Sequence, residues 1–117
     1  MKTILVVGRE WKFRALLRAQ LREEGYPALG FATLEEAVVH LASGTPPPAA
    51  LVFDTTEAPA VEMRAELAAL AESRRAGPVM VVAAAHEQFD WPSLHVLRRP
   101  LRLGEVVAAV RELAGDA

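Results

Sequence analysis

The sequence predicts an α/β domain in which a parallel sheet is covered by helices on both faces. Short, continuous apolar runs alternate with amphipathic segments along the chain, which is typical of successive βαβ units. The apolar runs lack the alternation of a half-exposed strand, so we expect them to be buried on both faces, as in parallel sheets. The chain has 117 residues, of which 52% are hydrophobic and 24% charged, which suffices for one domain with its own core.

Five strands are expected from the apolar runs. The second is the weakest, because Pro27 and Gly30 interrupt it. The third ends directly before Asp54, and the fourth (VMVV) gives the purest strand signal in the chain. The five expected strands are residues 3–7, 28–32, 49–53, 79–82 and 94–97.

Four helices are expected between and after these strands. Residues 10–24 have a helical apolar stripe, formed by Phe13, Leu16, Leu17 and Leu21. A capping box, Thr33 to Glu36, opens the second helix, for which we expect an inward side made of Leu34, Ala37, Val38 and Leu41. The other two helices are expected at residues 61–74 and 103–113.

Composition and charge exclude several classes of function. The 13 Lys and Arg nearly balance the 15 Asp and Glu, for a net charge of −2. This balance leaves no excess of positive charge that would favour direct binding to nucleic acid or to an anionic membrane. The chain has no cysteine, which excludes disulfides and thiolate sites, and no apolar run of about 20 residues, so we expect a cytoplasmic protein.

The order of these elements resembles the receiver domain of bacterial two-component response regulators. Three stretches carry the likeness: ILVV at 4–7, leading into an arginine-rich helix that ends EEGY; LVFD at 51–54; and LRRPL at 97–101. The resemblance implies a single receiver-like domain over residues 1–117, without an output domain. It also implies a doubly wound, flavodoxin-like five-stranded sheet of order 2-1-3-4-5, with its site at the carboxyl ends of the strands.

The resemblance places a phosphorylation pocket here, and most of its residues are replaced. The phospho-accepting aspartate corresponds to Asp54, and Thr56 takes the place whose backbone carbonyl would touch Mg²⁺. The two acidic residues that would help to hold the metal correspond to Gly8 and Arg9, followed by Glu10, which would compensate only through a shift in register. Replacing a carboxylate by a guanidinium turns an attraction of roughly 4 kcal/mol into repulsion. We therefore expect no metal or other cofactor, and Mg²⁺ only if the pocket is active.

The remaining pocket positions also differ from the family pattern. The switch serine or threonine corresponds to Ala83, and the lysine before proline corresponds to Arg99. Arg9, Asp54 and Arg99 are expected to converge at neighbouring strand ends. Two arrangements stay open: one or both arginines pair with Asp54, or the arginines face solvent and Asp54 caps the next segment.

The connection before the fifth strand is too short for a full fourth helix. Only residues 85–98 separate the end of the fourth strand from Arg99, and they must also contain the fifth strand. We expect this helix to be shortened or missing. Phe89 and Trp91 in this connection either form an exposed anchor for a partner protein or fill the space that the missing helix leaves.

These observations favour an atypical stand-alone receiver that acts in signal transduction by binding a protein partner, and that is not an enzyme. Two alternatives stay open: a phosphorylatable receiver that accepts a phosphoryl group on Asp54 from a histidine kinase, and a small-ligand sensor. Whether the chain forms a homodimer also stays open. Mg²⁺ binding at the strand ends would separate the phosphorylatable receiver from the other two.

Overall fold

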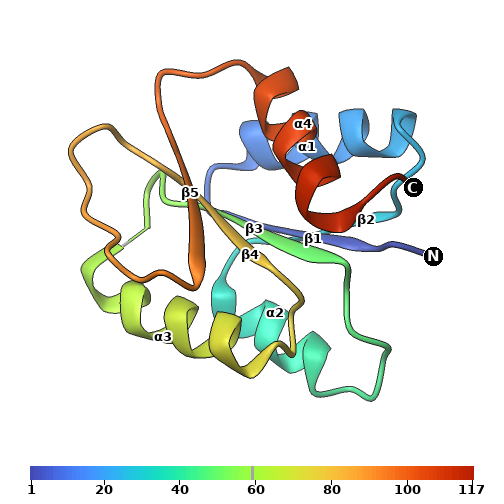
Figure 1. The fold of residues 1–117 in the computed structure, drawn as a ribbon, viewed down its shortest axis with the longest axis horizontal. Helices are drawn as coiled ribbons and strands as arrows, with labels where there is room; N and C mark the ends of the chain where they lie inside the picture. The colour runs from blue at the N-terminus through green and yellow to red at the C-terminus, as the bar shows by residue number, and fades with distance from the viewer. Residues whose placement is uncertain (59) are drawn as a thin grey trace.

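The computed structural model describes residues 1–58 and 60–117 and contains one five-stranded parallel sheet. The strand order is β2-β1-β3-β4-β5, as the resemblance implied. Helices α1 and α4 lie on one face of the sheet, and α2 and α3 lie on the other (Figure 1). The strands are β1 (Ile4–Val7), β2 (Ala28–Phe31), β3 (Ala50–Asp54), β4 (Val79–Ala83) and β5 (Leu94–Arg98), and the helices are α1 (Trp11–Glu23), α2 (Leu34–Leu41), α3 (Ala60–Ser73) and α4 (Leu103–Ala114).

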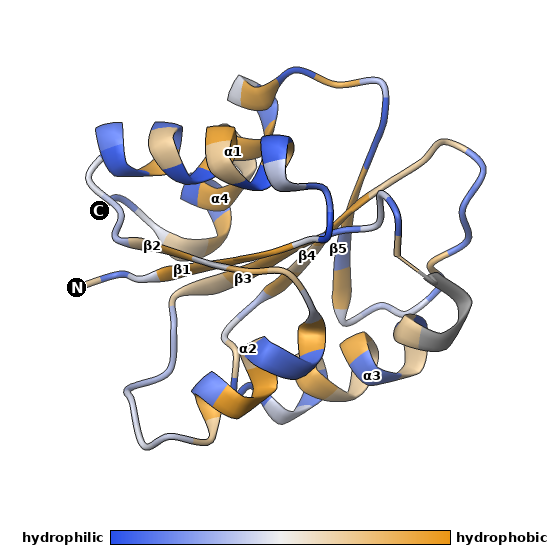
Figure 2. Ribbon diagram, turned by 180° about the vertical axis from the view of Figure 1, so that it is seen from behind, coloured by the Kyte–Doolittle hydropathy of each residue, from blue (hydrophilic) through white to orange (hydrophobic). Residues whose placement is uncertain are grey.

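The core forms two layers, one on each face of the sheet. Every residue of the three central strands is buried, and Figure 2 shows most of their length in the hydrophobic colours. Alternate residues of each strand face opposite sides. In β3, Leu51 and Phe53 pack toward α2 and α3, whereas Ala50 and Val52 pack toward α1 and α4. None of the described helices is long and apolar enough to cross a membrane.

Helix α1 has a narrower buried side than the sequence predicted. Leu17 and Leu21 are fully buried, and Phe13 packs against the same core. Leu16, however, is 51% exposed. The i, i+4, i+8 spacing of the three buried residues defines the inward line, and Leu16 lies about 100° away from it.

Helix α2 begins at the predicted cap. The Glu36 backbone N–H donates to Thr33 Oγ1 at 3.2 Å, and Glu36 Oε2 accepts from the backbone N–H of Ala32 at 3.0 Å. The return bond therefore reaches one residue further back than in a standard capping box. Val38 was predicted to face inward and instead is 37% exposed, because Leu34 and Ala37 occupy the line that faces the sheet.

The connection from β4 to β5 contains no helix, and all of its residues are described. Phe89 is only 5% exposed and packs in the core beneath α2 and α3, with the Arg64 guanidinium 5.2 Å from the centre of its ring. Trp91 is half-buried against the same core. Phe89 therefore fills the space beside the sheet, and the alternative of an exposed partner anchor is wrong for this residue.

Candidate functional site

Asp54 ends β3 and is a buried charged residue at the carboxyl edge of the sheet, with an exposed fraction of 1%. Its Oδ1 accepts hydrogen bonds from the Thr56 backbone N–H at 3.1 Å and from Thr56 Oγ1 at 3.0 Å. The same oxygen accepts from Arg99 Nη2, which completes an ion pair. One carboxylate oxygen therefore receives three donors, one of them cationic, and such charge-assisted bonds are the stronger kind.

Arg99 is held over Asp54 from three directions. Its backbone N–H donates to the Ala83 carbonyl at 2.8 Å, and Nη1 donates to the Val82 carbonyl at 3.2 Å. The guanidinium also lies 5.6 Å from the centre of the Phe13 ring, within the range of a cation–π contact. The side chain is 29% exposed, so the ion pair joins a buried carboxylate to a partly exposed cation.

The backbone at Gly8 leaves little room for a side chain beside Asp54. A Cβ added to Gly8 would lie 3.0 Å from the Asp54 Cβ and 3.5 Å from Oδ2. The residue is buried, and its N–H donates to the Phe31 carbonyl at 3.0 Å. Glycine at this position therefore permits the close packing of β1 against the aspartate.

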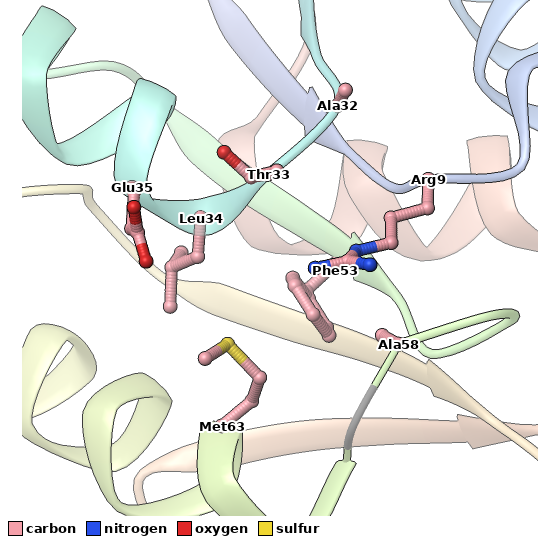
Figure 3. A pocket seen from close by; sticks show the side chains of 8 residues that line it. All are labelled: Arg9, Ala32, Thr33, Leu34, Glu35, Phe53, Ala58 and Met63. Atoms are coloured by element: carbon pink, nitrogen blue, oxygen red, sulfur yellow. The ribbon is translucent and has the colours of Figure 1, made fainter.

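Arg9 does not converge on Asp54, so the prediction that all three charged residues meet is wrong for it. Within the described part of the chain, the ion pair of Asp54 is with Arg99. Arg9 is exposed and lines a cavity of about 130 Å³ together with Phe53 and Met63. Figure 3 shows the Arg9 side chain extending toward Phe53, on the side of the sheet that carries α2 and α3.

Glu10 serves helix α1 and not a metal. Its two carboxylate oxygens accept from the backbone N–H groups of Lys12, at 3.1 Å, and Phe13, at 2.6 Å. The bond from Phe13 lowers the pKa of the Glu10 carboxyl below its ordinary value. A register shift that would aim Glu10 at the pocket would give up this cap.

The residues present do not fit Mg²⁺. That ion prefers several hard oxygen ligands in octahedral geometry. The pocket offers the Asp54 carboxylate, already bonded to a guanidinium, whereas Gly8 has no side chain and Glu10 is committed to α1.

Two features of the site were missed in the sequence. Glu87 Oε1 accepts from the Ala84 backbone N–H at 2.7 Å and from Thr55 Oγ1, so it ties the ends of β3 and β4 together. Nothing in the sequence marked Glu87, because a single acidic residue in a loop is unremarkable. Phe13 was assigned to the core, and its contact with Arg99 appears only in three dimensions. Ala83 is fully buried, toward α2 and α3.

Comparisons with known proteins agree on the fold. No protein-family model and no curated protein matches the sequence. Among solved structures, a receiver domain of the Francisella response regulator 1452 is 18% identical, with a TM-score of 0.78 over 97% of each chain. A response regulator receiver domain from Clostridium thermocellum is 15% identical, with a TM-score of 0.79 over 97% of this chain and 94% of that one. The receiver domain of the hybrid histidine kinase CckA is 21% identical, with a TM-score of 0.70 over 96% of this chain and 98% of that one. The chain therefore has the fold of response regulator receiver domains.

Proposed function

We propose that this protein is a receiver-type signalling module that acts by binding a protein partner, with an Asp54 pocket that does not undergo Mg²⁺-dependent phosphorylation. The observation that carries the proposal is the Arg99–Asp54 ion pair. In this pair a fixed guanidinium occupies the face of the carboxylate where an active receiver, by resemblance, would have its lysine and metal. Phosphoryl transfer depends on positioning and charge neutralisation, and here the neutralising charge already belongs to the protein.

In this proposal the pair holds the pocket in one state. Arg99 bonds to Asp54 and to the Val82 carbonyl at once, and Phe13 packs against its guanidinium. Breaking the pair would leave a carboxylate that is almost wholly buried without its cation, which is costly. Ala83, at the position of the family's switch hydroxyl, has no hydroxyl to respond to a phosphoryl group.

Incubation with a small phosphodonor and Mg²⁺, followed by intact-mass spectrometry, tests the proposal. We expect no phosphoryl adduct, and no saturable change in the amide shifts of residues 53–56 during a millimolar Mg²⁺ titration. Asp54→Ala is the negative control. Arg99→Lys, which restores the lysine that the resemblance implies and removes the guanidinium from Asp54, is the variant in which we expect Mg²⁺ binding to increase.

A phosphorylatable receiver is the second candidate, and one observation favours it. Among the described residues, Asp54 Oδ2 has no hydrogen-bond partner, so one carboxylate oxygen is uncommitted. A stoichiometric phosphoryl adduct that disappears in Asp54→Ala would establish this candidate in place of the first.

A further inference from the structure

Helices α2 and α3 lie on the same face of the sheet, with a groove between them that we call the α2/α3 groove (Figure 1). Its volume is about 670 Å³. Each helix follows a strand of the parallel sheet, so the two helices run in the same direction along the groove. More than half of the lining residues are apolar: Leu34, Val38 and Val39 of α2, and Ala69 and Leu70 of α3.

Two valines give α2 an apolar ridge on its solvent side. Val39 is 71% exposed and Val38 is 37% exposed, whereas Leu34 and Ala37 already pack α2 against the core. Val39 lies about 140° around the helix from Leu34, so it points away from the sheet. β-branched residues are weak helix formers, because the helix restricts their side chains. Neither the core nor helix propensity accounts for these valines, and burial against a second surface would account for both.

The side of the groove that α3 forms is low. Ala69 and Ser73 are exposed and lie one helical turn apart, and Leu70 beside them is buried. Small side chains at this spacing form one patch on the helix surface and leave room for a neighbouring side chain. A protruding valine and a hollow that can receive one therefore lie next to each other on the same face of the molecule.

The charged lining residues lie toward opposite ends of the groove. Glu35 is in the first turn of α2 and Glu66 is in the first half of α3, whereas Arg75 follows the end of α3 at Ser73. Glu66 and Ser73 are about 10 Å apart along the helix axis, and Arg75 lies beyond Ser73. All three charged side chains are exposed. The groove therefore has two carboxylates toward one end and a guanidinium at the other.

Other charged groups near the groove leave this arrangement intact. Glu36 accepts from the backbone N–H of Ala32 and so belongs to the cap of α2. Glu72 and Arg74, which carry opposite charges, line a separate cavity. Within the part of the chain that the structure describes, the three charged lining residues form no ion pair of their own. Their charges remain to be met by another surface.

We infer that the α2/α3 groove is an interface between two copies of this chain, related by a two-fold axis perpendicular to the helices. An interface of this kind uses the same face twice, so the face must complement itself. The axis places the Val39 ridge of each copy in the groove of the other. It also exchanges the two ends of the groove, so that Glu66 of one copy meets Arg75 of the second copy, twice.

A second copy fits the groove because the face already supplies both halves of the match. Apolar residues lie between the charged ends, and an apolar centre with charge toward its rim is the usual anatomy of an interface. A different protein would need a ridge and a charge order that this face itself provides. The inference goes beyond the proposed function and does not depend on the state of Asp54.

Sedimentation equilibrium of the full chain, from about 1 µM to about 1 mM, tests the interface. We expect a species of twice the mass of the 12.7 kDa chain to form as the concentration rises. Over the same range, the amide signals of α2 and of residues 66–75 should shift, and those of α1 on the opposite face should not.

Two variants of similar exposure separate this groove from general stickiness. Val39→Glu brings two carboxylates into the apolar centre and should weaken the dimer by at least about tenfold. Leu16→Glu is the control, because Leu16 is 51% exposed on α1, on the opposite face of the sheet, and should leave association unchanged. Circular dichroism confirms that both variants fold.

A charge swap tests the two-fold arrangement. Glu66→Arg and Arg75→Glu each place like charges opposite one another and should weaken the dimer by about fivefold or more. The double variant should regain the affinity, because opposite charges meet again across the axis. An effect within one chain would not produce this rescue, since the two positions are farther apart than the Debye length of about 8 Å.

Three outcomes would overturn the inference: a chain that stays monomeric up to about 1 mM, equal effects of Val39→Glu and Leu16→Glu, or a charge swap that restores nothing. A monomeric chain whose α2 and α3 signals shift with a lysine-rich amphipathic peptide would assign the groove to a basic partner in place of a second copy. The phosphodonor experiment is independent of all of these. If Asp54 is phosphorylated and the dimer still forms, the proposed function alone fails.

Discussion

Arg99 and Arg9 lie at the same edge of the sheet, close to Asp54 in the fold, and have opposite environments. Arg99 is the first residue after β5 and pairs with the buried carboxylate. Arg9 is the second residue after β1, is exposed, and lines a cavity with Phe53 and Met63 (Figure 3). The arginine at position 99 therefore covers Asp54, whereas the arginine at position 9 lies on the opposite face of the sheet.

Strand alternation explains this difference. Val52 faces α1 and α4 and Phe53 faces α2 and α3, so the next side chain, that of Asp54, returns to the α1 and α4 face. By the same count Gly8 continues on the Asp54 face and Arg9 on the opposite one, while Leu97 and Arg99 share the Asp54 face. One position along the chain decides which arginine reaches the aspartate.

The largest expected effect comes from breaking the Arg99 pair while leaving Arg9 as the control. Arg99→Ala and Asp54→Ala should each destabilise the fold by about 3 kcal/mol, because each leaves its partner uncompensated. Arg9→Ala should change the free energy of unfolding by less than about 0.5 kcal/mol. Urea melts of the three single variants and the two double variants with Asp54→Ala measure these energies.

The double variants decide between pairing and mere proximity. The Arg99 cycle should give a coupling energy of about 1 kcal/mol or more, and the Arg9 cycle should be additive. If the effects of Arg99→Ala and Asp54→Ala on the free energy of unfolding simply add, the pair contributes nothing specific. If the effects of Arg9→Ala and Asp54→Ala are coupled, both arginines act on Asp54.

Gly8→Ala tests the close approach of β1 to Asp54. The new Cβ would lie 3.0 Å from the Asp54 Cβ, and the aspartate is fixed by its pair, so we expect a loss of about 1–3 kcal/mol. Gly104→Ala is the matched control, because a Cβ there meets no atom within 4 Å. Equal effects of the two substitutions in denaturant melts would contradict a steric role for Gly8.

Thr56→Val removes a neutral donor to the same carboxylate oxygen and keeps the shape of the side chain. The bond from Thr56 Oγ1 to Asp54 is lost, while the backbone N–H bond at 3.1 Å remains. We expect a loss of about 0.5–1.5 kcal/mol. A loss as large as that of Arg99→Ala would show that the charge of the arginine is not the main source of stability.

The smallest effect concerns Glu10, the acidic residue that follows Gly8 and Arg9 and caps α1. Its folded pKa is lowered by the Phe13 N–H bond, so its contribution to stability is complete above the ordinary pKa of 4.5. That contribution is lost as pH falls through the lower folded value. Glu10→Gln should therefore melt slightly below the wild type at pH 7 and match it in acid. Thermal melts across pH check this, and a difference that persists in acid would argue against the cap.

Most of the fold was predictable because it depends on patterns that span several residues. Continuous apolar runs such as residues 79–82 indicated strands buried on both faces, and amphipathic segments indicated the helices between them. The short connection after Ala83 left no room for a full fourth helix, and the structure has none there. Errors fell on Leu16 and Val38, which border the buried side of their helices, where a shift of one residue changes burial.

The sequence by itself determined the sheet of parallel strands, the position of Asp54 at its carboxyl edge, and the identity of Gly8 and Arg9 at the two positions after the first strand. The alternation of side chains along each strand already implied which of the two arginines shares the face of Asp54, because alternation is a local property of the backbone. The tertiary structure alone decided how Arg99 lies on Phe13, that Glu87 ties two strand ends together, and that an apolar groove opens between α2 and α3. These features depend on contacts between residues distant in the chain, and such contacts follow from packing, which no local pattern records.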